Sequence, residues 1–557
     1  MKSMNCAVVA LGAVLASSCA TKGRGMPQFP TRDELKKLTS GPRPSATFNE
    51  RASKRSAWDL KGPFPTSVVV EAPRQPSALW QKVAAAAAGR GLIATEAMDC
   101  AAREEAAFVA ATKELPGSLL RDFIAGRCAT GAPQVVTRVF ETKAEPSVTD
   151  QALVDHVANQ VSSALLEFPP GAHVGAAFAR SGDQVAVVVA SVVPRATLEP
   201  VPVLPTGNTV ELKGVVEAGT IALEGAVTQG EVLAEVCEDL KLRPLPAFDL
   251  RCTLDANDSS AWITVSTRKQ GRLLGLEAAR VLVWPKGAPV STWTRPQPVR
   301  DGIAANREAI VKELSDLRVK AGRPPLALAV AQSQDNDEVA PFLFDAMSRG
   351  DEALADRLAL GVAAGWRVEH EISGGNFFAQ AAEQNDGSLL LTRMLLSPST
   401  RASLFDPKTT ELALGLLKEG ELLAMLGSVY EKLEPLPFPA SSDALLARLN
   451  AERARRGVAA VKGLRLAGGT EPSYGARLKS GELDLNAAGE AFLQEAVNTT
   501  QKGCTGMWLV AGSLDEVEFP DAFFSARRKE VVLYATTWRD PNAPWGQVLV
   551  LAATTDE

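Results

Sequence analysis

The sequence contains little histidine, few aromatic residues and few of the known catalytic motifs. Its 557 residues include three histidines, which argues against histidine-rich metal sites and against several classes of acid–base enzyme. It has no His-Glu-x-x-His, Walker loop, Gly-x-Ser-x-Gly or Cys-x-x-Cys motif. A Ser/His/Asp triad, whose members can be far apart in sequence, would have to use His156, His173 or His370.

The composition is that of an ordinary globular protein. Hydrophobic residues are 46% and charged residues 22%, which excludes a mostly disordered, collagenous or multi-span membrane chain. At ~150 residues per domain, the length predicts roughly four domains. The formal net charge of −6 disfavours a broad nucleic-acid-binding surface, so we expect no nucleic acid among the partners.

Residues 1–18 are typical of a lipoprotein signal peptide, and Cys19 would be the first residue after cleavage. An apolar run of ten residues, Ala7–Ala16, is too short to span a bilayer as a helix. It leads into Leu15–Cys19 (LASSC), which resembles the bacterial lipobox. The resemblance implies diacylation of Cys19 and a lipid-anchored chain, and Ala20 after the cysteine implies sorting to the outer membrane. The alternative is an ordinary secretory signal with an incidental Cys19.

Cysteine usage fits an oxidising envelope. Of seven cysteines, Cys6 leaves with the signal peptide and Cys19 would carry lipid. Two of the remaining pairs are candidate disulfides: Cys100 with Cys128, and Cys237 with Cys252. Cys504 is then left over. The alternative is five reduced and buried cysteines.

Residues 19–65 are predicted to form a flexible, lipidated tether. Residues 20–65 are rich in proline and glycine, and hold ten Lys and Arg against four Asp and Glu. A flexible segment of this length has a root-mean-square span of roughly 35–40 Å. It would hold folded units clear of the membrane and could touch anionic lipid or glycan, although a solvated linker is the simpler interpretation.

The chain after the tether repeats itself weakly. An amphipathic helix closed by glycine is predicted three times, at Leu79–Gly91, Ile310–Gly322 and Leu445–Gly457. Each helix opens a segment that ends in a predicted β-hairpin, at Val174–Val189, Leu412–Gly427 and Val531–Leu551. The helix glycine and the hairpin glycine are 91 residues apart in the first copy and 98 in the second. Such repetition indicates one structural unit used three times.

Residues 197–298 differ from the repeats. They contain short strand-like runs, such as Val210–Val216 and Ala261–Thr267, separated by turn residues and without helical periodicity. This pattern predicts an inserted β-sandwich. The proline-rich stretch Pro285–Pro298 marks its end.

Two segments of the second copy carry a family resemblance. Its opening helix ends in Arg318–Leu326 (RVKAGRPPL), and Leu396–Pro407 reads LSPSTRASLFDP. They resemble the CAP superfamily (cysteine-rich secretory proteins, antigen 5 and pathogenesis-related 1) in its bacterial form. There the first helix reads N-x-x-R-x-x-x-G-x-x-P-L and a later helix S-P-x-H-R-x-x-L-L. Asn450, Arg453 and Gly457 echo the first motif in the third copy.

The resemblance implies an α-β-α sandwich for each unit and an extracytoplasmic setting. The predicted fold is therefore α/β (α+β), with CAP-like units at 66–196, 299–434 and 435–557 around a β-sandwich at 197–298.

The residues of the family's cleft are not matched. CAP domains often hold a divalent metal with two histidines and two acidic residues, but Thr400 stands where the motif has its second histidine. Gly374-Gly375-Asn376 lacks the acid of the family's Gly-Glu-Asn motif. In Glu369-His370-Glu371, strand alternation would place both carboxylates on the face opposite His370. We therefore predict no cofactor, and His370 is a weak metal candidate because one histidine is a poor zinc site.

Acidic and aromatic clusters have structural interpretations. The acidic stretch Asp335–Glu338 lacks the glycine turn and distal glutamate of a calcium loop, so we expect a solvated face. Asp255, Asn257 and Asp258 read as a turn between strands. Aromatic residues at strand spacing are either core or a surface for glycan or protein: Trp508, Tyr534, Trp538 and Trp545 in the last copy, and Phe377-Phe378 in the second.

The function that these observations favour is a non-catalytic envelope lipoprotein. It would bind or scaffold envelope protein partners in a surface or periplasmic assembly, with lost site residues on a retained fold. The first alternative is a lipid- or sterol-binding protein, a role that the wider family implies, with an apolar cavity. The second is a peptidoglycan or peptide hydrolase, in which His156, His173 or His370 would meet carboxylates in a cleft.

Overall fold

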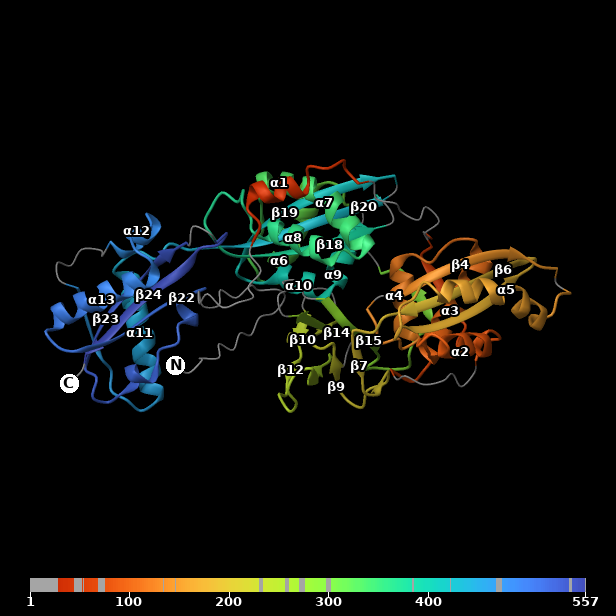
Figure 1. The fold of residues 1–557 in the computed structure, drawn as a ribbon, viewed down its shortest axis with the longest axis horizontal. Helices are drawn as coiled ribbons and strands as arrows, with labels where there is room; N and C mark the ends of the chain where they lie inside the picture. The colour runs from red at the N-terminus through yellow and green to blue at the C-terminus, as the bar shows by residue number, and fades with distance from the viewer. Residues whose placement is uncertain are drawn as a thin grey trace.

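The structure is a computed structural model. It describes residues 29–555 apart from 45–52, 54, 69–75, 134, 146, 230–233, 256–259, 270–275, 297–301, 383–384, 421, 467–472 and 540–542. The predicted signal peptide and Cys19 lie outside the described residues. Three α/β units and one β-domain form an elongated molecule with unit 3 and unit 1 at its two ends (Figure 1). The predicted α/β class is confirmed.

The elements of the three units follow the chain in a similar order. Unit 1 holds α2 (Trp80–Ala88), β3 (Ile93–Ala94), α3 (Glu96–Thr112), α4 (Ser118–Arg127), β4 (Val136–Lys143), α5 (Asp150–Leu165), β5 (His173–Ser181) and β6 (Gln184–Val192). Unit 2 holds α6 (Arg307–Lys320), β17 (Ala327–Leu328), α7 (Val330–Arg349), α8 (Glu352–Ala363), β18 (Ile372–Ala382), α9 (Gly387–Leu396), α10 (Pro398–Phe405), β19 (Thr409–Glu419) and β20 (Leu422–Lys432). Unit 3 holds α11 (Ala440–Arg455), β21 (Lys462–Leu464), α12 (Tyr474–Lys479), α13 (Leu485–Thr500), β22 (Cys504–Ala511), η1 (Leu514–Glu516), η2 (Asp521–Phe524), β23 (Glu530–Trp538) and β24 (Gln547–Thr555).

Each unit is built on a four-stranded sheet with the same topology. The strand orders are β3-β5-β6-β4, β17-β19-β20-β18 and β21-β23-β24-β22. In each sheet the short edge strand (β3, β17 or β21) pairs in parallel with the first strand of the predicted hairpin. The other edge strand (β4, β18 or β22) pairs antiparallel with the second strand of the hairpin. Helices pack on both faces, for example α3 on one side of unit 1 and α2 and α5 on the other. The three units are therefore structural repeats.

The predicted β-sandwich lies between the first two repeats. Its sheets have the orders β11-β10-β14-β15 and β12-β13-β9-β7, with all pairings antiparallel. Its strands are β7 (Ala196–Leu198), β9 (Thr209–Val216), β10 (Thr220–Thr228), β11 (Ala234–Val236), β12 (Glu238–Asp239), β13 (Ala247–Thr253), β14 (Ala261–Lys269) and β15 (Leu276–Val283). Alternating apolar residues such as Leu212, Leu250 and Ile263 form its core.

A buried arginine closes one end of units 2 and 3. Arg318 donates to the carbonyl oxygens of Pro324 (2.7 Å), Leu404, Asp406 (3.2 Å) and Thr409 (2.9 Å). Arg453 donates in the same way to those of Ala459 (2.7 Å), Phe523, Ser525 (3.2 Å) and Arg528 (3.3 Å). Each guanidinium thus supplies hydrogen-bond donors to backbone carbonyl groups of the loop that precedes the hairpin. The arginine that carried the family resemblance is a structural residue.

The other motif positions also build the fold. Asn450 bonds in both directions with the backbone of Val461, and Ser315 does the same with Leu326, eleven residues away in each case. Gly91, Gly322 and Gly457 have φ of 67°, 69° and 70°, which favours glycine at these helix ends. In unit 1 the equivalent of Arg318 is Ala87 and that of Ser315 is Ala84, so this repeat has lost both side-chain contacts.

Both predicted disulfides form. Cys100 of α3 bonds to Cys128 at the end of α4, and Cys237 bonds to Cys252 of β13 in the β-sandwich. Among the described cysteines, Cys504 is free and partly exposed. Nor does any helix in the described part of the chain combine the length and apolar content that crossing a bilayer requires.

The predicted tether differs from expectation because much of it is docked. We call residues 29–44 and 55–68 the strap. Its elements are α1 (Arg32–Leu38), β1 (Ala57–Asp59) and β2 (Ser67–Val68). α1 packs on α8, while β1 pairs with β16 (Thr292–Thr294) and β2 with β8 (Val201–Pro202). Apolar residues dispersed among the prolines, such as Leu35 and Leu60, are buried and hold it.

Unit 1 is fixed to its neighbours in the same way. The backbone N–H groups of Lys61 and Gly62 in the strap each donate to the Glu104 carboxylate over 2.8 Å. Leu119 of α4 packs against the core of unit 2. The described strap and units therefore make one continuous set of contacts.

Arg453→Ala tests the buried arginine. The change leaves four carbonyl oxygens without their donor, so we expect the free energy of unfolding of unit 3 to fall by about 3–5 kcal/mol. Hydrogen exchange of β23 and β24 measures this locally. Arg455→Ala, on the same helix with a side chain 73% exposed, is the matched control and should cost less than about 0.5 kcal/mol. Equal protection in both variants would contradict the structural role.

Glu105→Gln tests a buried carboxyl in unit 1. Burial raises the pKa of Glu105, and the nearest cation is Arg121 at 3.7 Å. In the unfolded chain a glutamate loses its proton near pH ~4.3, whereas in the folded state Glu105 keeps its proton to higher pH. The free energy of unfolding therefore falls as the pH rises from the unfolded pKa through the folded pKa. Removing the charge should raise the melting midpoint of unit 1 by a few degrees at pH 8 and by less at pH 5. The exposed control Glu145→Gln should show no such pH dependence.

Candidate functional site

The family resemblance would place a cleft in unit 2 where β18 and α10 meet, and in the structure these two elements are in direct contact. Asn376 of β18 donates from Nδ2 to Oγ of Ser403 on α10 over 2.8 Å. Thr400, at the place of the motif's histidine, is 3% exposed. On the other side of the sheet, a Cβ at Gly375 would lie 2.2 Å from the carbonyl oxygen of Ala363 at the end of α8, so only glycine fits there. The segments come together as expected, but in tight packing.

Arg401, next to Thr400, ties α10 to its surroundings. Its guanidinium donates to the carbonyl oxygen of Leu395 and, over 3.3 Å, to that of Gln229 in the β-sandwich. Burial lowers the pKa of Arg401 to about 10, so the side chain stays charged at neutral pH. α10 also contacts β10 and β11. The helix that carries the motif is therefore a packing element between two parts of the molecule.

His370 contacts an acid that the sequence analysis did not identify. Glu369, His370 and Glu371 precede β18, which begins at Ile372, so the predicted strand alternation does not apply to them. The His370 imidazole pairs through Nε2 with the carboxylate of Glu411 on β19. Glu411 is 7% exposed, whereas the His370 side chain is about half exposed. The pair is a histidine and one carboxylate at the edge of unit 2.

This pair is on the opposite side of the sheet from α10. Glu411 is the register partner of Tyr430, whose hydroxyl donates to the carbonyl oxygen of Val362 on α8. Asn376 is the register partner of Val429, which packs with α9 and α10. Directly paired residues face the same side of a sheet. His370 is therefore separated by the sheet from the place where the resemblance would put a metal cleft.

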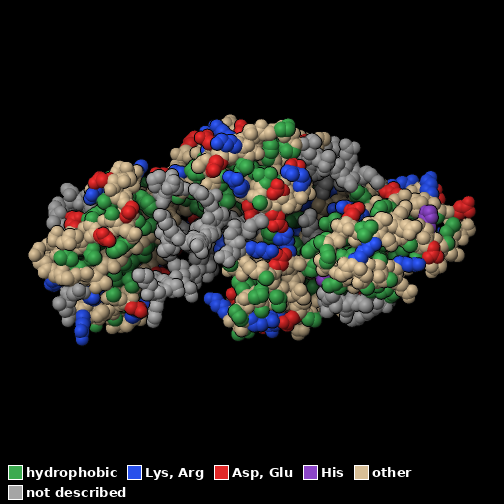
Figure 2. Space-filling view, in the orientation of Figure 1, with side chains coloured by type: hydrophobic (Ala, Val, Ile, Leu, Met, Phe, Trp, Pro, Cys, Tyr) green, Lys and Arg blue, Asp and Glu red, His purple; other side chains and the backbone are tan. Residues whose placement is uncertain are grey.

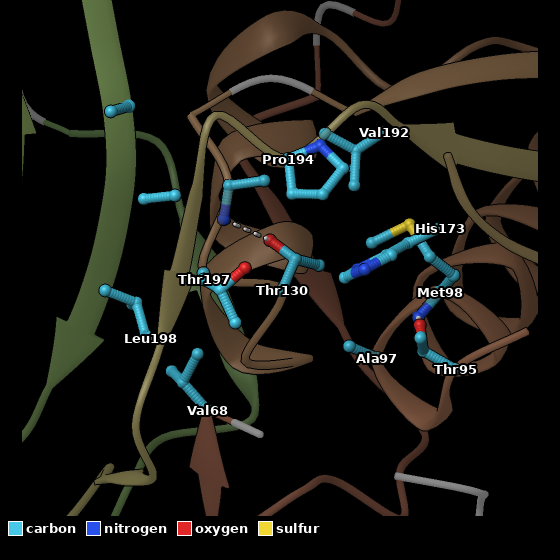
Figure 3. Close-up of a pocket in the computed structure, with 14 residues that line it drawn as sticks. Val68, Thr95, Ala97, Met98, Thr130, His173, Val192, Pro194, Thr197 and Leu198 are labelled. Atoms are coloured by element: carbon cyan, nitrogen blue, oxygen red, sulfur yellow. Dashed lines mark hydrogen bonds between the residues drawn. The ribbon is translucent and has the colours of Figure 1, made fainter. Parts of the chain in front are cut away.

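Neither of the other two histidines meets a carboxylate among the residues that the structure describes. His156 is exposed on α5. His173, at the start of β5, lines a cavity of about 30 Å³ between unit 1 and the β-sandwich, together with Thr95, Met98 and Pro194 (Figure 3). Burial lowers the pKa of His173, which favours the neutral imidazole. The cavity has room for only one or two water molecules, far less than a sterol or an acyl chain needs.

The acidic stretch 335–338 is not the solvated face that we expected. Asn336 is fully buried on α7 and donates to Oγ of Ser428 over 3.0 Å. Asp335 pairs with Arg367 at 3.1 Å, and Asp337 with Arg307. These groups are satisfied by protein partners because α7 lies directly on the sheet. Within the described residues, no three His, Cys, Asp or Glu side chains are grouped as metal ligands would be.

The predicted turn at 255–258 can be followed only at its first residue. Asp255 accepts from and donates to the side chain of Gln229 through its backbone, whereas Asn257 and Asp258 lie outside the described residues.

The visible face of the molecule mixes acidic and basic side chains over all units (Figure 2).

The aromatic residues of unit 3 do not form one exposed surface. Tyr534 and Trp538 are buried in its core, and Trp508 is partly buried with its Nε1 donating to Asn486 over 3.1 Å. Phe378 is likewise buried in unit 2, with Phe377 partly buried on the other face. The core interpretation therefore holds for these residues.

Trp545 instead joins three parts of the molecule. From the turn between β23 and β24 it enters unit 2, where its Nε1 donates to the carbonyl oxygen of Ala363 over 3.2 Å. Phe29 of the strap packs edge-on against its ring, with centroids 4.9 Å apart. The carbonyl oxygen of Pro30 accepts from Trp366 over 3.1 Å. We call this contact the junction.

Sequence reasoning missed the junction, although one signal for it was present. Thr31 and Glu34 form a reciprocal capping box ahead of Leu35 and Leu38, which is a helix-start pattern. That pattern predicts α1 inside the supposed tether. Its docking place depends on residues more than 300 positions away and is not visible in the sequence.

The comparisons with known proteins are sparse. No family model matches the chain, and no curated protein matches it. Similar solved structures include a cysteine-rich secretory protein from Staphylococcus aureus, 12% identical, covering 43% of this chain and 87% of that one, with a TM-score of 0.17. An extracellular protein containing an SCP domain from Bacillus anthracis is 15% identical, with 43% and 86% covered and a TM-score of 0.16. Na-ASP-1 is 8% identical, with 56% and 78% covered and a TM-score of 0.17.

These neighbours are CAP and SCP domain proteins, but TM-scores this low carry no argument about the site or the activity. The three-fold repetition of the chain rests on its own strand order, and the buried arginines are shared by units 2 and 3.

His370→Ala tests whether this histidine is a metal ligand or a structural partner. The change leaves the buried Glu411 carboxylate without its imidazole, so unit 2 should lose about 1–2 kcal/mol of unfolding free energy. Zinc titrations of the two proteins should superimpose, since zinc sites need three or four ligands. His156→Ala is the exposed control and should leave both readouts unchanged. Tight zinc binding that disappears with His370→Ala would contradict this assignment.

Proposed function

We propose that the chain is a non-catalytic envelope lipoprotein that serves as a binding or scaffolding component. It would be anchored through Cys19, at the outer membrane, and would present its units to envelope protein partners. The mechanism is structural: repeated α/β units are held in a fixed relation to one another and to the anchor.

The observation that carries the proposal is the use of the motif helix α10. Its Thr400 is buried, its Arg401 bonds to a β-sandwich carbonyl, and His370 lies across the sheet. A CAP-like unit with this arrangement keeps the fold but not the ligand set. Fold without site residues favours a binding role over a catalytic one.

Two further features support an extracytoplasmic scaffold. Two disulfides in a chain of this size are typical of an oxidising compartment. Three repeats also multiply contact surfaces on one chain, which raises the effective concentration of linked contacts without new chemistry.

The test is chemical cross-linking in intact cells, followed by mass spectrometry of the purified protein. We expect an acylated Cys19 and a reproducible cross-linked protein at fixed stoichiometry, with contacts that map to exposed residues of the units. Cys19→Ser should abolish both the acyl mass and the membrane fraction while leaving the fold unchanged.

Two outcomes would favour the alternatives. A stoichiometric lipid beyond the anchor, in a preparation free of protein partners, would favour a lipid or sterol carrier. Hydrolysis of peptidoglycan or peptide that His370→Ala abolishes would favour an enzyme.

A further inference from the structure

We infer that the strap holds the junction of units 2 and 3 close to the lipid surface, within about 33–36 Å of it. This inference rests on the proposed lipid anchor at Cys19 and concerns where the folded units lie relative to it. A free tether over 19–65 would let the units range over tens of ångströms. The docked strap removes most of that freedom.

The first contact of the strap is aromatic and well buried. Phe29 packs on Trp545, and Trp545 is itself 7% exposed between units 2 and 3. Pro30 accepts a hydrogen bond from Trp366 of unit 2. The chain is therefore seated at the junction from residue 29 onward.

The second contact is the packing of α1. Leu35 is 4% exposed and fills the space above Gly361 on α8, where a Cβ would lie 2.5 Å from its Cδ1. Arg32 reaches Asp335 of α7 at 3.7 Å. A glycine at 361 is thus matched to a leucine in the strap, which indicates a specific seat.

The chain length between Cys19 and Phe29 limits how far the junction can lie from the membrane. Phe29 is the tenth residue after Cys19, and a chain of ten residues spans at most about 33–36 Å when fully extended. With Cys19 acylated in the bilayer, the junction must lie within that distance of the lipid surface. Unit 1 lies at the opposite end of the molecule from unit 3, so this limit applies directly to the junction and only indirectly to unit 1 (Figure 1).

The experiment uses full-length lipidated protein in vesicles that carry an energy-transfer acceptor on their headgroups. The donor is placed by Ala353→Cys at an exposed site on α8, in a Cys504→Ser background. One variant receives a 30-residue Gly/Ser insertion between Cys19 and Phe29. The matched variant receives the same insertion after Pro44, on the far side of α1.

The two insertions separate the docked strap from a free tether. Insertion before Phe29 lengthens the anchor from ten to forty residues, whose root-mean-square span doubles from roughly 16–19 to roughly 32–38 Å, so transfer should fall. Insertion after Pro44 should leave transfer as in the parent. Equal losses from both insertions would overturn the inference, because they mean that the whole 19–65 segment acts as the tether.

A further control separates this inference from the proposed function. Phe29→Ala with Leu35→Asp should release the strap and make transfer sensitive to the insertion after Pro44, while the protein stays with the vesicles. A chain without an acyl group at Cys19, which does not float with vesicles, overturns both. A lipidated chain with equal insertion effects overturns only the inference.

Discussion

The docking of the strap is the constraint on which the arrangement of the units depends. Residues 29–44 bind units 2 and 3 through Phe29 and Leu35, and residues 55–68 bind unit 1 and the ends of the β-sandwich segment through β1 and β2. A segment near the N-terminus thus contacts parts of the chain that are hundreds of residues apart. Ordering it costs conformational entropy, which burial of its apolar residues offsets. The strap therefore links the units to one another by direct contacts.

Within the units, the stabilising chemistry is that of the repeated motif. The guanidiniums of Arg318 and Arg453 each satisfy four backbone carbonyls, a role that needs several fixed donors and that lysine cannot fill. Unit 1 has Ala87 instead, and there Arg90 reaches the carbonyl oxygen of Ser162 over 2.8 Å. In units 2 and 3 the motif that carries the family resemblance therefore has a structural role, although unit 1 forms the same sheet without the arginine.

Much of the fold could be predicted because its signals are local. Glycine-closed helices, hairpins with a central turn and alternating strands each have short-range causes, and the structure confirms them. The strap could not, because its proline-rich, basic composition resembles a linker while its partners are distant. The prediction of a solvated face at residues 335–338 was wrong for a similar reason, because only tertiary packing shows that Asn336 faces the sheet. The His370 pairing depends on Glu411, forty-one residues away on another strand.

The most direct test of this account is the distance between spin labels on the two end units of the intact protein. One label on unit 1 and one on unit 3, measured by pulsed electron double resonance, report whether the units are held together. The account predicts a single narrow distance distribution that broadens when Phe29 and Leu35 are replaced. A broad distribution in the unaltered chain would show that the units move independently and would contradict the rigid scaffold.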